Sequence, residues 1–194
     1  MRRPRLVIML KEPVAGRVKT RLGRDLGMTT AAWWFRHQSN DLIRRMARDP
    51  RWETILAVAP DRAVMSRFWP VYIRKMAQRS GNLGQRMQHI LMKAGSGPVI
   101  IIGADIPRIT TGQIANAFAK LMSNDMVFGP APDGGFWLVG AAKRSKPLPK
   151  TLFNAVRWSS KHALSDTLKS TGAARVAMIN MLQDVDTIND LRHQ

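Results

Sequence analysis

Short apolar runs separated by turn-forming residues extend along the whole chain. Residues 5–10 and 53–59 are rich in aliphatic and β-branched side chains, and each run is followed by a proline-containing segment, which is typical of strands. The most apolar run is residues 99–102, four consecutive aliphatic side chains between Pro98 and Gly103. A strand without a polar face is typical of the centre of a parallel sheet, where helices cover both faces.

Helical spacing of apolar residues alternates with these strands. The pattern predicts helices over residues 29–48, 61–69, 82–94, 112–122 and 161–170 and from residue 187 on, and further strands over residues 71–76, 125–128, 136–140 and 174–179. Strands and helices that alternate without internal repeats indicate an α/β fold. We therefore expect residues 1–194 to form a single three-layer α/β/α domain with a mostly parallel sheet.

The composition narrows the class of protein. The chain has 194 residues and no cysteine, which excludes disulfides, thiolate catalysis and cysteine-ligated metal sites. The apolar run at residues 6–10 is too short for a signal-peptide core. No apolar run approaches the roughly 20 residues of a membrane-spanning helix. We expect a cytoplasmic enzyme without a membrane span.

The net charge of +18 results from 31 Lys and Arg residues against 13 Asp and Glu residues. Such an excess invites a nucleic-acid-binding interpretation. The basic residues are spread along the chain rather than gathered in one block, and no pattern of aromatic and basic residues recurs. Nucleic acid is therefore the less favoured partner, and a basic surface that attracts phosphorylated substrates explains the same composition.

Ligands of parallel α/β sheets bind beyond the carboxyl ends of the strands, so the loops after residues 10 and 102 are candidate sites. The first loop is interrupted by Pro13 and Gly16 and contains four cations: Lys11, Arg17, Lys19 and Arg21. Glycine permits close backbone approach, and backbone N–H groups together with cationic side chains are what a diphosphate requires. On spacing alone, a solvated basic turn is the alternative.

Carboxylates follow two of the predicted strands. Asp105 comes directly after the buried strand, and Asp184 and Asp186 lie on the same side of an extended segment. Two carboxylates about 4 Å apart repel each other by roughly 4 kcal/mol at an effective dielectric constant of 20. If these residues meet, they need a cation, and oxygen ligands favour Mg²⁺ or Mn²⁺. Turn capping by Asp105 is the alternative.

A glycine-rich turn follows the strand at residues 125–128. Its sequence is Asp133-Gly134-Gly135-Phe136-Trp137. Two adjacent glycines let the backbone approach a ligand, and the aromatic pair could line a pocket. A hairpin turn with aromatic residues in the core is the alternative.

Together these segments resemble a known family, the bacterial GT-A-fold nucleotide-diphospho-sugar transferase-like proteins of the arsenosugar-biosynthesis type. The matching segments are residues 11–13, 16–22, 82–87, 103–107, 129–130, 133–138, 158–159, 184–187 and 190–191. They occur in the order in which the family has them. Related folds include molybdenum-cofactor and phospholactate nucleotidyltransferases. The chain departs from the family at Ala104, where Ser is more frequent, and at Phe136 and Trp137, where a Tyr pair is usual.

The resemblance implies a metal-dependent transferase that uses a nucleotide sugar as donor and a small molecule as acceptor. The residues expected to bind the nucleotide and its phosphates are Lys11, Pro13, Gly16, Arg17, Lys19, Arg21, Gly84 and Arg86. Lys19 and Arg21 would stabilise the departing diphosphate, and Asp133 would orient or deprotonate an acceptor hydroxyl. The residues expected on the acceptor side are Gly134, Gly135, Phe136 and Trp137. The implied metal ligands are Asp105, Asp184 and Asp186.

A nucleotidyltransferase is the alternative from the same residues. It would couple an NTP to a phosphorylated small molecule and release pyrophosphate, and the four cations of the first loop suit a triphosphate nearly as well as a diphosphate.

Overall fold

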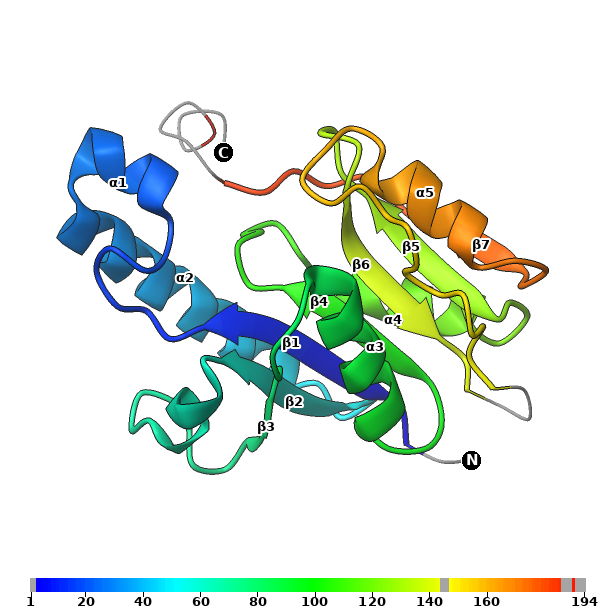
Figure 1. The fold of residues 1–194 in the computed structure, drawn as a ribbon. Helices are drawn as coiled ribbons and strands as arrows, with labels where there is room; N and C mark the ends of the chain where they lie inside the picture. The colour runs from blue at the N-terminus through cyan, green and yellow to red at the C-terminus, as the bar shows by residue number, and fades with distance from the viewer. Residues whose placement is uncertain (1–2, 144–146, 186–189, 191–194) are drawn as a thin grey trace.

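The strands of a computed structural model, which describes residues 3–143, 147–185 and 190, form a seven-stranded sheet in the order β3-β2-β1-β4-β6-β5-β7 (Figure 1). The strands are β1 Arg5–Lys11, β2 Glu53–Ala59, β3 Arg74–Ala77, β4 Val99–Gly103, β5 Met126–Pro130, β6 Phe136–Ala141 and β7 Val176–Met178. β6 is antiparallel to both of its neighbours, and the other pairings of the described strands are parallel. The predicted α/β fold with a mostly parallel sheet is confirmed.

The central strand of the sheet is the aliphatic run at residues 99–102. β4 lies between β1 and β6. The side chains of Ile100 and Ile102 belong to the core on one face of the sheet, and those of Val99 and Ile101 belong to the core on the other. Alternate residues of a strand point to opposite faces, so an all-aliphatic run suits a strand that is covered on both sides.

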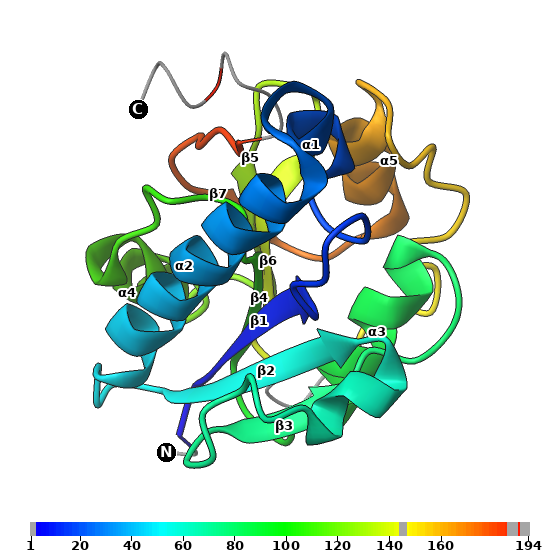
Figure 2. The ribbon, with the colours of Figure 1, turned by 90° about the vertical axis from the view of Figure 1, so that its left-hand side faces the viewer.

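Helices cover both faces of the sheet (Figure 2). α2 Met28–Ala47 and α4 Thr111–Lys120 contribute to the core on one face, and α3 Leu83–Lys93 and α5 Ala163–Ser170 pack on the other. Two shorter helices complete the described elements: α1 Thr20–Leu26 and the 3₁₀ helix η1 Asp61–Met65. None of the helices in the described parts of the chain combines the length and the apolar character needed to cross a bilayer.

Side-chain caps begin two of the helices. Thr110 accepts a hydrogen bond from the backbone N–H of Gln113, and the side-chain oxygen of Gln113 accepts one from the backbone N–H of Thr110 at the start of α4. Asn82 and Gln85 form the same capping box at the start of α3. Such reciprocal bonds satisfy two backbone donors that the first helical turn leaves unpaired.

Several element boundaries differ from the sequence expectation. The predicted basic loop ended at Arg21, but its last two residues already belong to α1, a helix over residues 20–26 that was not predicted. The helix predicted over residues 61–69 is reduced to η1, and β3 begins at Arg74 because Val71 and Tyr72 are exposed ahead of the sheet. The terminal helix expected from residue 187 lies outside the described residues, apart from residue 190, which is helical.

Candidate functional site

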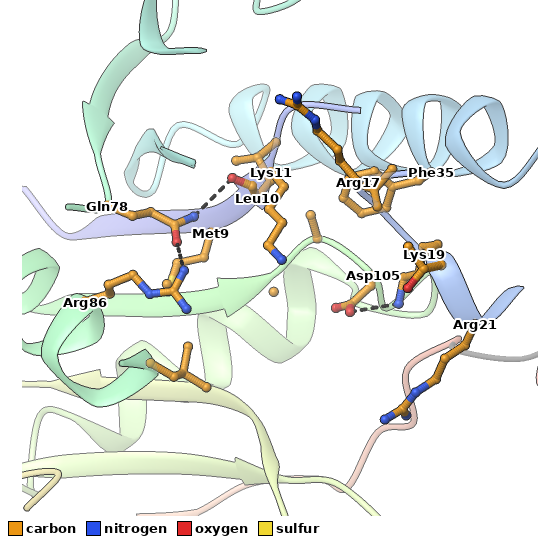
Figure 3. A pocket seen from close by; sticks show the side chains of 15 residues that line it. Met9, Leu10, Lys11, Arg17, Lys19, Arg21, Phe35, Gln78, Arg86 and Asp105 are labelled. Carbon is orange, nitrogen blue, oxygen red and sulfur yellow. Dashed lines mark hydrogen bonds and ion pairs between the residues drawn. The ribbon is translucent and has the colours of Figure 1, made fainter. Parts of the chain in front are cut away.

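A pocket of about 410 Å³ lies at the carboxyl ends of β1 and β4 (Figure 3). Its cationic lining residues are Lys11, Arg17, Lys19, Arg21 and Arg86. Among the described residues that line it, Asp105 is the only carboxylate. We call this space the cationic pocket. The four cations predicted from the first loop therefore do gather around one space, and α3 contributes a fifth.

Lys19 stands at the junction between the basic loop and α1. Its backbone is in the left-handed region, with φ 45° and ψ 47°, a conformation that is uncommon for a residue with a side chain. The side chain is only 7% exposed, and its Nζ lies 3.0 Å from Oδ2 of Asp105. Lys19 was predicted to bind phosphate and Asp105 to bind a metal, whereas here each contacts the other.

Asp105 is held between a strand end and the C-terminal segment. A Cβ atom on Gly103 would lie 2.8 Å from Oδ1 of Asp105, so glycine at this position lets the carboxylate fold back over the end of β4. The backbone carbonyl of Asp105 accepts a hydrogen bond of 3.2 Å from the N–H of Val185. This bond brings the residue next to Val185, Asp184, to the same part of the molecule.

Gln78 occupies the other side of the cationic pocket and is 3% exposed. Its Nε2 donates to the carbonyls of Leu10, at 3.0 Å, and Ala57, at 2.8 Å. Its Oε1 accepts from Nη1 of Arg86 at 3.1 Å. Sequence reasoning missed Gln78 because a single glutamine after a strand belongs to no distinctive motif.

Gln78 thereby orients the guanidinium of Arg86. The Nε of Arg86 is buried and has no hydrogen-bond partner within the described part of the chain. A buried donor without a partner is costly. The guanidinium directed into the pocket could donate to an anionic or carbonyl oxygen of a ligand.

The cations of the pocket differ in direction. Figure 3 shows the amine of Lys11 and the guanidinium of Arg86 directed into the pocket, and the guanidinium of Arg17 pointing away from Asp105. Arg17 is exposed, so its side chain can rotate at little cost.

Three residues expected to bind phosphates do not line the cationic pocket. Pro13 is half-buried, and Gly16 lies at an exposed position of the loop with φ 74° and open space around it. Gly84 is buried at the start of α3, where an added Cβ would lie 2.7 Å from both Phe153 and Trp158. Gly84 therefore permits close packing under α3.

A second pocket of about 360 Å³ adjoins the first. The residues that line both pockets are Met9, Leu83, Gly103 and Asp105. The second pocket also contains Asp133 and Asp184, and none of the described residues that line it is Lys or Arg. We call it the acidic pocket. The structure thus brings together Asp105 and Asp184, two of the three predicted metal ligands.

The glycine-rich turn forms one wall of the acidic pocket. Asp133, Gly135, Phe136 and Trp137 line it. Oδ1 of Asp133 accepts a 2.8 Å bond from the N–H of Gly135, which shapes the turn. Gly134 does not line the pocket. Its backbone has φ 83°, and an added Cβ would collide with the backbone of Lys161, which precedes α5. Its carbonyl accepts a 2.9 Å hydrogen bond from the N–H of Leu164.

The predicted metal site is only partly described. Asp186 lies outside the described residues. Within the described ranges, no three acidic or histidine side chains lie close enough together to hold a metal ion. The ligand set of Asp105, Asp184 and Asp186 therefore stays a prediction.

Solved structures define the class of this fold. A provisional nucleotide-diphospho-sugar transferase from Desulfovibrio desulfuricans superposes with a TM-score of 0.85 at 29% identity, over 98% of this chain and 85% of that chain. The 4-diphosphocytidyl-2C-methyl-D-erythritol synthase of Anaerococcus prevotii superposes with a TM-score of 0.60 at 11% identity, over 98% of this chain and 95% of that chain. A Mycobacterium tuberculosis protein in complex with manganese superposes with a TM-score of 0.54 at 15% identity, over 98% of this chain and 96% of that chain. The latter two share the fold alone. The chain has the nucleotide-diphospho-sugar transferase fold.

The chain belongs to the DUF2064 family, described as an uncharacterized protein family conserved in bacteria, whose model matches residues 42–160. The match begins within α2 and therefore does not include the loop at residues 11–21. A comparison with the curated proteins gives no match. The resemblance to nucleotide-diphospho-sugar transferase-like proteins, inferred from motifs, is confirmed.

Proposed function

We propose that the protein is a metal-dependent glycosyltransferase that takes a sugar from a nucleotide sugar and passes it to a small-molecule acceptor. The observation that carries this proposal is the meeting of the cationic pocket and the acidic pocket at Asp105. Transfer of a sugar requires cations where the diphosphate departs and a proton acceptor where the hydroxyl attacks. The likeness to the D. desulfuricans protein at 29% identity supports the same class.

The cationic pocket would hold the nucleoside diphosphate. Lys11 and Arg86 already point into it, and charge-assisted hydrogen bonds contribute roughly 1.5–3 kcal/mol each. Lys19 would turn from Asp105 to a phosphate oxygen, and Arg21 would rotate inward. In these positions both would stabilise the negative charge that develops as the diphosphate leaves.

Mg²⁺ or Mn²⁺ is part of the proposal. Asp105 and Asp184 line the same pocket, and their carboxylate oxygens are the donors that these ions prefer. Asp186 would be the third ligand. The ion would neutralise charge on the diphosphate as a Lewis acid. Lys19 is paired with the Asp105 carboxylate, which would become available to the ion if Lys19 turned to a phosphate.

Asp133 is the candidate base. It is exposed at the acidic pocket, and Oδ1 is held by the N–H of Gly135. The second carboxylate oxygen would accept the proton of an acceptor hydroxyl.

Nucleotidyl transfer is the second candidate, and the five cations around one pocket favour it. A triphosphate carries more negative charge than a nucleotide sugar and would engage the same groups. A phosphorylated acceptor would then attack the α-phosphate, and pyrophosphate would leave.

A panel of donors separates these reactions. We expect release of a nucleoside diphosphate from at least one nucleotide sugar in the presence of Mn²⁺ or Mg²⁺, measured with an acceptor library and with water as the default acceptor. In parallel, NTPs are incubated with sugar phosphates and phospho-acids, and pyrophosphate is measured. Pyrophosphate without nucleoside diphosphate would favour nucleotidyl transfer. The absence of turnover and binding across the whole panel would exclude both.

The variants Lys19→Ala and Arg21→Ala test whether the cationic pocket binds the phosphates of the nucleotide. Each variant removes one charge-assisted contact, so we expect nucleotide affinity to fall by roughly 10- to 100-fold, measured by calorimetry. Arg24→Ala is the matched control, because Arg24 is an exposed cation of α1 that lines neither pocket. Wild-type affinity in both Lys19→Ala and Arg21→Ala would refute the phosphate site.

A further inference from the structure

We propose that the protein binds the surface of an anionic phospholipid membrane through residues 61–74, which we call the edge segment. This segment comprises η1, the turns that follow it and the first residue of β3. Because β3 is the last strand of the sheet beside β2, the edge segment lies at the rim of the molecule, at the lower left of Figure 1. The inference concerns an interaction surface and does not depend on the reaction that the protein catalyses.

Large apolar side chains of the edge segment project into solvent. Met65 is 87% exposed, Val71 is 92% exposed and Tyr72 is 73% exposed. Val71 and Tyr72 occupy the centre of a turn that is closed by a 3.3 Å bond from the N–H of Ile73 to the carbonyl of Pro70. Glycine, asparagine, aspartate and serine are the usual residues of turns. The geometry of the turn therefore does not explain why an aliphatic and an aromatic side chain stand here.

The edge segment is fixed on the sheet by its other side chains. Trp69 and Ala63 are buried in the core on the α2 face, and Nε1 of Trp69 donates to the carbonyl of Ala63 at 2.7 Å. Cζ of Arg36, which belongs to α2, lies 5.1 Å from the centroid of the Phe68 ring. These contacts hold the segment from below, so its projecting side chains are presented on a stable platform.

Cations accompany the projecting apolar side chains. The exposed cations of the edge segment are Arg62, Arg67 and Arg74. Residues 62–104 contain no Asp or Glu, and Asp61 is the one acid of the segment. Nη1 of Arg74 lies 3.7 Å from Oε1 of Glu53, whereas Arg62 and Arg67 form no ion pair with any described residue. The segment therefore presents uncompensated positive charge beside apolar groups.

This combination fits a lipid surface better than other anionic partners. Near an anionic membrane, arginines interact with the lipid phosphates while apolar side chains enter the boundary between headgroups and acyl chains. Tyrosine is enriched at that boundary. A nucleic acid would engage the arginines and leave Met65 and Val71 in water. A protein partner needs a contiguous, closely packed patch, whereas a fluid lipid surface accommodates side chains that project separately.

Co-sedimentation of the full chain with phospholipid vesicles tests the inference. We expect binding to vesicles of equal parts phosphatidylcholine and phosphatidylglycerol to be at least about ten-fold tighter than binding to phosphatidylcholine alone. Added salt should weaken the binding without abolishing it, because salt screens the charges but not the apolar contribution. Equal affinity for the two kinds of vesicle would overturn the inference, and so would the absence of binding to both.

Matched charge variants separate the edge segment from the charge of the whole chain. The double variant Arg62→Gln with Arg67→Gln should lower the affinity for the anionic vesicles by roughly ten- to thirty-fold. The control, Arg24→Gln with Lys93→Gln, removes the same charge from exposed positions of α1 and α3 and should lower the affinity by less than about three-fold. Equal losses in the two double variants would show binding by overall charge and would overturn the inference.

A matched pair of methionines tests the apolar contribution. Met65→Ser should lower the affinity for the anionic vesicles by roughly ten-fold. Met92→Ser changes a methionine of α3 that is 62% exposed, and it should leave the affinity unchanged. Vesicle binding that is insensitive to Met65→Ser would contradict entry of the edge segment into the lipid surface.

Two further measurements complete the experiment. Thermal unfolding of each variant verifies its fold, and the wild-type comparison of the two kinds of vesicle decides alone if a variant fails to fold. Duplex DNA is added to the vesicle-bound protein at the same phosphate concentration. Retained vesicle binding would support a lipid surface, whereas displacement by the DNA would overturn the inference in favour of a nucleic acid.

Discussion

Gln78 connects three strand ends through one buried side chain. It bonds carbonyls of β1 and β2, follows β3 directly, and sets the position of the Arg86 guanidinium. A buried amide with both of its ends paired is a stable orienting group, because any rotation would leave donors and acceptors unsatisfied. Gln78 therefore acts as a positioning residue for a cation that faces the ligand.

The variant Gln78→Met tests this role. It keeps the volume but leaves the carbonyls of Leu10 and Ala57 without their donor, at a cost of about 1–3 kcal/mol for each group left unpaired. We expect a lower free energy of unfolding in urea and weaker nucleotide binding by calorimetry. Gln88→Met, at a half-buried position of α3 outside both pockets, is the control. Unchanged nucleotide affinity in Gln78→Met would show that Arg86 keeps its position without the hydrogen bond to Gln78.

Single residues differ in how well the sequence predicts them. Lys19 and Asp105 were found as candidates because each follows a strand, and strand ends can be located from local patterns. Their ion pair was not predicted, since it joins residues 86 positions apart. Gly84 was assigned to phosphate binding, yet its packing role depends on Trp158, which approaches it only in the folded chain.

At the scale of elements, the segment before α5 supports the acidic pocket. Arg157 binds Asp166 of α5 through two contacts, Nε to Oδ2 at 2.8 Å and Nη2 to Oδ1 at 2.9 Å. The Arg157 guanidinium holds the pKa of the Asp166 carboxyl well below its usual value. Trp158 and Ser159 follow Arg157 directly, so this ion pair positions two residues that line the pocket.

We expect Asp166→Asn to lower the midpoint of thermal unfolding at neutral pH. A carboxyl whose folded pKa is depressed stabilises the protein fully above its unfolded pKa of about 3.9 and loses that contribution as pH falls toward the folded pKa. The difference between wild type and variant should therefore shrink below about pH 4. Thermal unfolding across this range measures it.

Two controls accompany this variant. Asp25→Asn changes an exposed carboxylate of α1 outside both pockets, and its effect should be small at every pH. Nucleotide affinity should be retained in Asp166→Asn, because Asp166 does not line the cationic pocket. A loss of nucleotide affinity instead would contradict a role restricted to the acidic pocket.

Element prediction succeeded where an apolar period or a capping residue marked the element and failed for a short helix that has no side-chain cap. The predicted bounds of β2 agree with the structure, and α2, α3 and α4 lie within a few residues of their predicted ends, because apolar period and caps are local properties. The seven-residue α1 escaped prediction. It has no side-chain cap. Packing against α2 therefore provides the stability that a short, uncapped helix does not have by itself.

At the scale of the whole molecule, the +18 charge admits two interpretations. A nucleic-acid protein would use the charge as an extended surface, whereas a transferase would concentrate it where phosphates bind. Five cations at one pocket favour the second interpretation. They account for only part of the excess.

Ligand-induced stabilisation distinguishes these interpretations. A nucleoside diphosphate at about 100 times its Kd should stabilise the fold by about 2.7 kcal/mol, which raises the unfolding midpoint by roughly 5–11 °C for a chain of this size. The corresponding uncharged nucleoside should give a smaller shift. Asp105→Asn should remove any further gain from Mn²⁺. A larger shift with duplex DNA, lost steeply with added salt, would support the nucleic-acid interpretation instead.

The sequence by itself determined the α/β class, the central strand, most of the elements and the loops that surround the site. These depend on periodicity, caps and turn residues, which act between neighbours in the chain. Only the tertiary structure decided that Lys19 neutralises Asp105, that Gln78 holds Arg86, and that pockets of opposite charge meet at Asp105. Each of these depends on the order of strands in the sheet, which brings distant residues within hydrogen-bonding distance.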